Sequence, residues 1–110
     1  MVSRGEVWWH EDPSSGRRPH LILTRDEAIP VLHEVLGVPA TRTVRGIPSE
    51  VPLDTADGMP EACALTLDNL VPIMTSRCTE LITRLAPEHM EMVCLALAAA
   101  TGCRVTPAPR

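Results

Sequence analysis

Short apolar runs separated by turn sequences fill residues 1–86, and this pattern most constrains what the chain can fold into. Proline, serine, aspartate and glycine cluster between the runs, as in residues 12–16 and 57–60, and such clusters are typical of turns. The runs are short and rich in β-branched and aliphatic residues, which predicts strands rather than helices. We expect strands at residues 5–10, 19–24, 31–38, 48–53, 63–67, 71–74 and 80–85.

The last apolar segment, residues 87–100, has a different pattern and predicts a helix. Pro87 stands in its first turn, where a missing N–H costs nothing, and Gly102 follows as a helix-ending residue. Apolar residues recur at helical spacing on one side, which we expect to face the core. They are Met90, Val93, Cys94 and Leu97.

Length and composition favour one domain with an aliphatic core. The 110 residues contain neither Phe nor Tyr, and no internal repeat or linker divides them. We therefore expect a single domain over residues 1–110, mainly β with a C-terminal helix (an α+β chain). Residues 103–110 are expected to form a flexible tail.

The cysteines and the N-terminus carry no signal for a metal, a membrane or secretion. The four cysteines, at positions 63, 78, 94 and 103, have no spacing typical of a zinc site, so we expect no metal and no cofactor. No run of 18 apolar residues suggests a transmembrane helix, and the charged N-terminus is unlike a signal peptide. Reduced thiols and a cytoplasmic location follow as expectations.

Charge is distributed unevenly along the chain. The net charge of −4 argues against a general nucleic-acid binder, whose affinity comes largely from excess positive charge. All ten basic residues are arginine, and residues 17–45 hold five of them, whereas residues 50–61 hold four acids and no base. A basic first half beside an acidic middle is compatible with a focused anion site.

The most informative motif is Arg17-Arg18-Pro19, which stands between two predicted strands. Two adjacent guanidiniums in a fixed position suit a phosphate or a carboxylate. The first of these strands holds both tryptophans of the chain, Trp8 and Trp9. Adjacent strand residues point to opposite faces, so we expect one tryptophan in the core. The other either packs under a loop, stacks on a nucleobase or lies in an interface.

An ordered set of motifs over residues 4–102 resembles the MazF/PemK family of toxin endoribonucleases. Each motif alone is weak, but their order and spacing in so short a chain are specific. The motifs are Arg4-Gly5-Glu6-Val7-Trp8, Gly16-Arg17-Arg18-Pro19, Val38-Pro39-Ala40-Thr41, Gly46-Ile47-Pro48-Ser49-Glu50-Val51, Leu67-Asp68-Asn69-Leu70 and Ile82-Thr83-Arg84-Leu85.

The resemblance implies an SH3-like β-barrel that works as a homodimer. It also implies metal-independent cleavage of single-stranded RNA, which leaves a 2′,3′-cyclic phosphate and a 5′-hydroxyl. Carried over by position, the catalytic arginine is Arg18 and the catalytic threonine is Thr41. The implied partner is a MazE-like antitoxin whose C-terminal segment lies across the RNA-binding groove.

These roles agree with the chemistry of the two residues. The Arg18 guanidinium can stabilise the extra charge of the phosphorane, and the Thr41 hydroxyl can donate to a non-bridging oxygen. Arginine is a poor base, so the group that takes the proton from the 2′-hydroxyl stays open. His20 stands where the family usually has an aliphatic residue, and it is either structural or in contact with the substrate.

Five further residues are expected to contact the RNA. Arg17 supplies supporting charge, and Ser14 and Ser15 lie in a loop, residues 11–16, that is shorter than is common in the family. These serines either contact phosphate or base or are ordinary turn residues. Thr43 and Arg45 share the side of Thr41 in an extended segment, where Arg45 either contacts a phosphate or is simply solvated.

Two other functions remain open from the sequence. The same barrel serves a gyrase-poisoning toxin that binds a protein and cuts nothing, which would place function in the C-terminal helix and make Arg18 dispensable. The second is an inactive anion-binding module that retains affinity for RNA without turnover. Arg18-Pro19 and Pro39-Ala40-Thr41 favour the nuclease branch of the resemblance.

Overall fold

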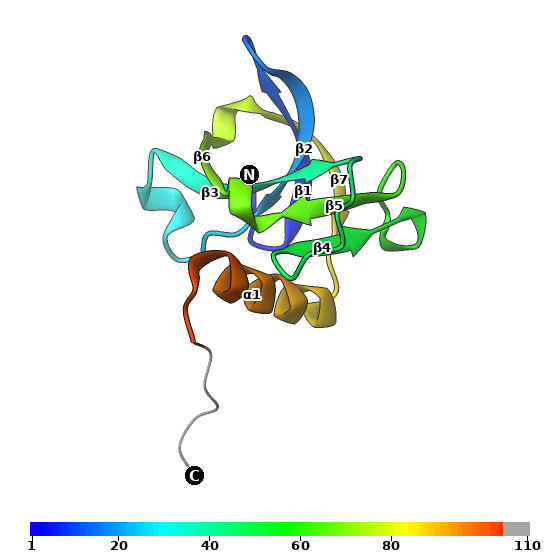
Figure 1. Ribbon diagram of the computed structural model, residues 1–110. Helices are drawn as coiled ribbons and strands as arrows, with labels where there is room; N and C mark the ends of the chain where they lie inside the picture. Colours follow the sequence, from blue (N-terminus) through cyan, green and yellow to red (C-terminus); the bar gives the residue numbers. More distant parts are fainter. Residues whose placement is uncertain (105–110) are drawn as a thin grey trace.

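A curled antiparallel sheet with one C-terminal helix forms the chain in the computed structural model, which describes residues 1–104 (Figure 1). Residues 105–110 of the predicted tail lie outside the described residues. All seven predicted strands and the helix are present, with ends shifted by up to three residues. They are β1 (Glu6–Asp12), β2 (Gly16–Ile22), β3 (Glu34–Thr41), β4 (Glu50–Leu53), β5 (Cys63–Thr66), β6 (Val71–Met74), β7 (Cys78–Arg84) and α1 (Pro87–Thr101).

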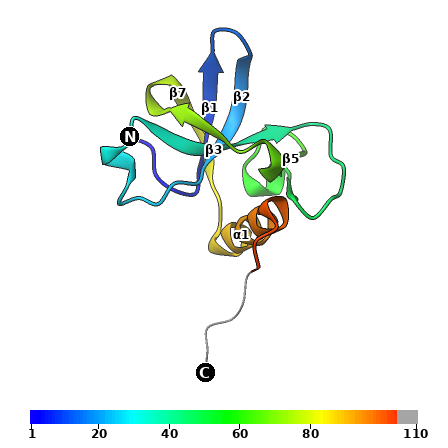
Figure 2. The same ribbon diagram turned by 60° about the vertical axis from the view of Figure 1, so that its left-hand side comes forward.

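Strand β3 is the hub of the sheet. The strand order is β4-β5-β3-β2-β1-β7, and β6 pairs with the first half of β3 while β5 pairs with its last residues. Every pairing is antiparallel, and the sheet curls into a half-barrel. This is the predicted fold class, an SH3-like barrel with a C-terminal helix. The β1–β2 hairpin projects on the side away from α1 (Figure 2).

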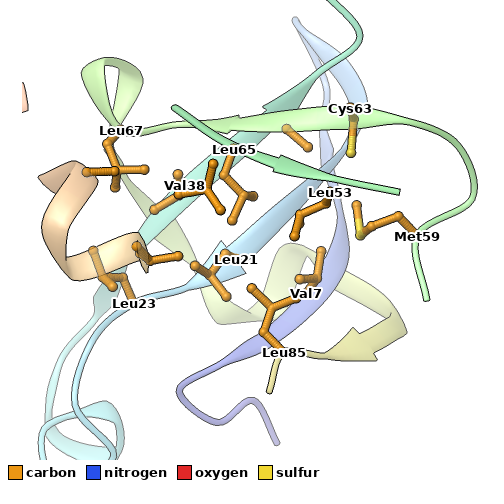
Figure 3. Packing of buried hydrophobic residues seen from close by; sticks show 14 residues of the cluster. Val7, Leu21, Leu23, Val38, Leu53, Met59, Cys63, Leu65, Leu67 and Leu85 are labelled. Atoms are coloured by element: carbon orange, nitrogen blue, oxygen red, sulfur yellow. The ribbon is translucent and has the colours of Figure 1, made fainter. Parts of the chain in front are cut away.

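An aliphatic core lies between the curled sheet and α1 (Figure 3). Val7, Leu21, Val38 and Leu65 from four strands are fully buried there, and Val93 of α1 covers them. Fully burying one such side chain contributes about 1.5–3 kcal/mol. The core therefore fixes β1, β2 and β3 against one another without any aromatic ring.

Helix α1 begins and ends as its sequence indicates. Pro87 occupies the first turn, and Gly102 takes the left-handed conformation (φ 74°) that ends the helix. Within the described chain, no helix combines the length and apolar character required to cross a bilayer.

The core-facing side of α1 differs in part from the prediction. Val93 is buried, and Met90 and Leu97 pack against the core, but Cys94 is exposed and the prediction for it was wrong. Ala96 is buried instead. The buried residues of α1 are thus Val93 and Ala96, three positions apart, and both belong to the core cluster.

A second, smaller core lies on the other side of β1 and contains Trp8. Its indole packs against a buried aliphatic cluster, and its Nε1–H donates to Glu6 Oε1 at 3.1 Å. Glu6 also accepts from Arg84 Nη2 at 2.6 Å and the Ser3 backbone N–H at 2.7 Å. The cluster consists of Val2, Ile22, Ile29, Val35 and Ile73. The sequence expected one tryptophan in the core without indicating which, and Trp8 is the one that packs, partly buried, against this cluster.

Candidate nucleic-acid site

A hollow of about 350 Å³ lies where the β1–β2 hairpin meets the end of β3. The hairpin contributes Trp9 and residues 17–19, and the end of β3 and the following segment contribute residues 40–43. The third wall consists of residues 59–61 and Cys63, which precede and begin β5. We call this hollow the hairpin cavity. It collects most of the arginine-rich segment that the sequence singled out.

The hairpin that carries the arginines ends in a tight, internally bonded turn. The Asp12 carboxylate accepts from the Ser14 backbone N–H and hydroxyl, both at 2.7 Å, and from the Ser15 backbone N–H at 3.0 Å. These hydrogen bonds hold the pKa of Asp12 well below its usual range. Gly16 (φ 87°) then supplies the left-handed backbone that starts β2. Ser14 and Ser15 lie at this tip, outside the cavity lining.

A glycine positions the wall formed by residues 59–61. Gly58 has a φ of 90°, and an added Cβ would stand 2.4 Å from the Thr83 hydroxyl oxygen. That hydroxyl donates to the Asp57 carbonyl at 2.9 Å, so the turn is fastened to β7. The Asp57 carboxylate lies 3.2 Å from His89 Nε2 on α1. The turn is therefore held against both β7 and α1. Residues 59–61, which form the wall, come directly after this turn in the sequence.

Both residues expected to be catalytic line the hairpin cavity. Within residues 1–104 the Arg18 guanidinium makes no hydrogen bond or ion pair, so all its donors face the cavity or solvent. The Thr41 hydroxyl oxygen accepts from the Thr43 backbone N–H at 3.1 Å, which leaves the hydroxyl proton available to a ligand. Thr43 lines the same cavity. The structure thus places both residues in the lining of one cavity.

Arg17 is at the cavity but is held by carboxylates. Its Nη2 donates to Glu80 Oε1 at 3.0 Å, and its Nε lies 3.7 Å from Glu11 Oε2. The guanidinium carbon stands 4.2 Å from the centroid of the Trp9 ring. Trp9 is a cavity residue; the sequence left stacking on a nucleobase open for one of the two tryptophans without indicating which. Alternation along β1 showed that the two tryptophans face opposite sides, but not which side carries the cavity.

A third arginine of the cavity, Arg42, was not among the expected site residues. Arg42 lines it and pairs with Glu61 at 3.2 Å. Its place in the arginine-rich segment, directly after Thr41, was the available signal. Arg45, which was expected to contact a phosphate, is exposed and outside the cavity lining. Its backbone N–H donates to the buried Glu50 at 2.9 Å.

His20 lies behind the cavity rather than in its lining. The side chain is buried, and its Nδ1 is 3.1 Å from the Arg18 carbonyl oxygen. The ring centroid is 4.8 Å from that of His10. Burial lowers the pKa of His20 to about 4 and also lowers that of His10. A neutral imidazole therefore supports the backbone of Arg18 at neutral pH.

The cavity offers donors for a phosphate and a flat surface for a ring. Arg18 and Thr41 supply charged and neutral hydrogen-bond donors, and the Trp9 ring supplies the surface. Across residues 1–104, no three His, Cys, Asp or Glu side chains gather in a way that could hold a metal ion. A phosphodiester with a neighbouring base has the chemistry that these groups complement.

Comparison with known proteins identifies relatives along nearly the whole chain. The model of a family described as "PemK-like, MazF-like toxin of type II toxin-antitoxin system" matches residues 3–101. The protein named "Probable endoribonuclease MazF5" of Mycobacterium tuberculosis is 41% identical over 104 residues, which cover 94% of this chain and 95% of that protein.

Solved structures share the fold. The Mycobacterium tuberculosis toxin MazF-mt6 superimposes with a TM-score of 0.83 at 28% identity, covering 91% of this chain and 99% of that one. A mycobacterial endoribonuclease in complex with its cognate antitoxin superimposes with a TM-score of 0.86 at 24% identity, covering 96% of this chain and all of that one, which shows likeness of fold. The curled sheet, the terminal helix and the match over residues 3–101 show that the chain belongs to the PemK-like, MazF-like toxins of type II toxin–antitoxin systems.

Proposed function

We propose that the chain is a toxin endoribonuclease that cleaves single-stranded RNA without a metal ion. The ribose 2′-oxygen forms a bond to phosphorus and loses its proton, while the bond to the 5′-oxygen breaks and that oxygen gains a proton. The products are a 2′,3′-cyclic phosphate and a 5′-hydroxyl. One observation carries this proposal for the site: Arg18, whose guanidinium has no partner within residues 1–104, lines the same cavity as Thr41. Family membership supports the activity.

Arg18 is proposed as the group that stabilises the developing charge. In the pentacoordinate transition state the non-bridging oxygens gain negative charge, and a planar guanidinium binds two such oxygens at once. Pro19 follows Arg18 directly and fixes the backbone there, while His20 contacts the Arg18 carbonyl. Arg18 therefore keeps its donors free on a backbone that is held in place.

Thr41 is proposed to donate one hydrogen bond to a non-bridging oxygen. The Thr41 hydroxyl oxygen accepts a hydrogen bond from the Thr43 backbone N–H, which orients the hydroxyl. The hydroxyl proton is not used in that bond and can be donated to a ligand. Arg17 and Thr43 are proposed to contact substrate beside the reacting phosphate, since both line the cavity. Ser14, Ser15, His20 and Arg45 lie outside the lining, and a contact from them requires RNA that extends beyond it.

The proposed setting is that of a type II toxin in the cytoplasm, working as a homodimer and neutralised by a MazE-like antitoxin. Exposed apolar side chains, among them Leu95 and Met92 on α1, are available for contact with a second chain. An acidic and apolar antitoxin segment would be attracted to Arg18, whose charge is unpaired. Light scattering of the purified protein tests the dimer, and co-purification with its antitoxin tests the partner.

The test of the activity is incubation of the purified protein with varied single-stranded RNAs, including tRNA, in EDTA. We expect fragments that end in a 2′,3′-cyclic phosphate, and Arg18→Ala and Thr41→Ala should each abolish most of the cleavage while retaining the native circular-dichroism spectrum. Cleavage by neither native protein nor variants would overturn the proposal. Inhibition of gyrase that is indifferent to Arg18→Ala would support the gyrase-binding alternative, and RNA binding without turnover would support the inactive module.

A further inference from the structure

Trp9 is partly exposed and lines the hairpin cavity. Its neighbour Trp8 is packed in the second core and donates its indole N–H to Glu6. The Trp9 indole N–H makes no hydrogen bond within the described part of the chain, and its ring lines the cavity with Arg18 and Thr41. A large aromatic ring beside a phosphate-binding group is a combination typical of single-stranded nucleic-acid sites.

The face of Trp9 is covered by Arg17. The guanidinium carbon lies 4.2 Å from the ring centroid, within the range of a cation–π interaction. Two carboxylates from different strands hold it there, Glu11 on β1 and Glu80 on β7. Glu11 is in turn oriented by the Thr79 hydroxyl, which donates to its Oε2 at 2.7 Å.

This cover is displaceable. The side chains of Arg17, Glu11 and Glu80 are 45%, 52% and 67% exposed, so their ion pairs are screened by water and contribute little to stability. An exposed cation–π contact is likewise weaker than the stacking of a nucleobase on an aromatic ring. A base can therefore replace the guanidinium on Trp9, and the released Arg17 can then pair with a phosphate.

We propose that Trp9 is a base-stacking subsite and that Arg17, held by Glu80 and Glu11, is its removable cover. The subsite takes a nucleobase next to the phosphate that Arg18 and Thr41 bind, because all three residues line one cavity. This inference rests on the proposed function, in that it assigns the base beside the scissile phosphate. It makes Trp9 and Arg17 determinants of which nucleotides are accepted.

The direct test uses the fluorescence of Trp9. Trp8→Phe leaves Trp9 as the only tryptophan, since the chain has two. The probe is a single-stranded oligonucleotide of mixed sequence built on 2′-deoxyribose, which lacks the attacking hydroxyl and cannot be cleaved by this route. The matched probe has the same sugars and phosphates but no bases. Both can pair with the arginines, and only the first can stack.

We expect the base-bearing oligonucleotide to quench Trp9 emission and to bind about five- to a hundredfold more tightly than the abasic one, as loss of one stacked base predicts. Equal quenching by both probes, or none by either, would overturn the subsite. A Trp9 signal without RNA cleavage by the native protein would retain the subsite and reject the nuclease. Cleavage without the signal would do the reverse.

The cover is tested by Glu80→Gln, which removes one of its two anchors. The matched control is Glu27→Gln, which removes the same charge from an exposed position in the segment before β3, outside the cavity lining. We expect Glu80→Gln to tighten binding of the base-bearing oligonucleotide a few-fold more than the control does. The same change in both variants would show that only net charge matters and would overturn the role of Arg17 as a cover.

Kinetics of the Trp9 variants separate stacking from support of the fold. Trp9→Phe keeps a ring and should retain most of the affinity, whereas Trp9→Leu should raise KM about five- to a hundredfold with kcat little changed. Equal losses in the two variants, or a loss confined to kcat, would contradict a stacking role. Because the fluorescence test leaves Trp9 intact, misfolding of a Trp9 variant does not remove the test.

Discussion

The two faces of the β1–β2 hairpin carry similar side chains, which are packed into the protein on one face and line the cavity on the other. On the closed side, Trp8 and the pair His10 and His20 are packed against other strands, and burial lowers the pKa of both imidazoles. On the open side, Trp9 and Arg17 line the hairpin cavity, contact each other, and Arg17 pairs with exposed carboxylates. An aromatic or basic residue thus indicates function only once its covering elements are known.

The difference arises from what each side packs against. The closed side meets the aliphatic cluster that includes Ile22 and Val35, so its polar groups must find partners inside the protein. The open side meets the end of β3 and the segment before β5, and Glu80 of β7 lies beside Arg17 there. Arg18 connects the two, because its carbonyl contacts His20 and the residue lines the cavity.

The largest effect should come from Arg18→Ala, which tests whether the open side carries the chemistry. Loss of a donor aimed at developing charge lowers kcat by about 10²–10³. Single-turnover cleavage of a defined RNA measures this, with Arg25→Ala, an exposed arginine outside the cavity lining, as the control. Similar cleavage rates for the two variants would show that Arg18 does not act in the site. They would also contradict the functional difference drawn between the two faces of the hairpin.

The next effect belongs to the closed side and is one of stability. The pKa of His20 is about 4 in the folded protein and 6.5 in the unfolded chain. Neutral, buried His20 therefore makes its full contribution to the free energy of unfolding above pH 6.5. As the pH falls from 6.5 towards 4, the unfolded chain binds a proton that the folded chain does not, and the free energy of unfolding drops by about 3 kcal/mol. Urea unfolding at pH 7 and pH 4.5 measures the drop.

His20→Leu sharpens this result. In this variant the free energy of unfolding should depend much less on pH. A shallower dependence should remain from His10, whose pKa is also lowered. It should also leave the pH dependence of kcat unchanged, since the His20 ring does not line the cavity. A shift in the pH profile of kcat would instead show that His20 takes part in proton transfer. The packed face of the hairpin would then contribute to catalysis as well as to stability.

Thr41→Val should have an intermediate effect on the open side. The change keeps the shape of the side chain and removes one hydrogen bond to a charged oxygen, which lowers kcat about ten- to a hundredfold. Thr43→Val, in the same cavity, is the matched control and should have a smaller effect. If the order of the two variants is reversed, the donor is Thr43 and the proposed geometry needs revision.

Arg45→Gln should have the smallest effect and tests how far the RNA extends. If the strand runs past the cavity to Arg45, affinity falls a few-fold and the slope of log Kd against log salt decreases by about 0.7. We expect this small change, measured by anisotropy of a labelled oligonucleotide at several salt concentrations. An unchanged slope would confine the bound RNA to the cavity lining.

Most of the fold could be predicted because its signals are local. The runs of alternating or continuous apolar residues and the turns between them identified all seven strands, and Pro87 and Gly102 marked the helix. β3 starts three residues later than expected because a 3-10 turn, Ile29–Val31, takes up the segment around Pro30. Cys94 was wrongly expected to face the core, because helical spacing identifies an apolar side of the helix but not how the helix is rotated about its axis against the sheet.

The site was harder to predict because it depends on contacts between distant residues. Arg18 and Thr41 were expected together through motifs, and the structure places both at one cavity. Trp9, by contrast, acquires its surroundings from Glu80, which is 71 positions away in the sequence and adjacent through the β1–β7 pairing. No local pattern states that pairing. The burial of His20 likewise depends on β3, which pairs with β2 at Pro39.

The ion pairs of the cavity also bear on how this acidic chain meets the large excess of nucleic acid in a cell. Arg17 and Arg42 are each occupied by the protein's own carboxylates, which act as tethered competitors for any incoming polyanion. A duplex offers phosphates but no free base to displace them, so its long-range attraction to the site is weak. A flexible single strand offers both groups at once. If the cavity binds RNA as proposed, this arrangement disfavours duplexes before any sequence is read.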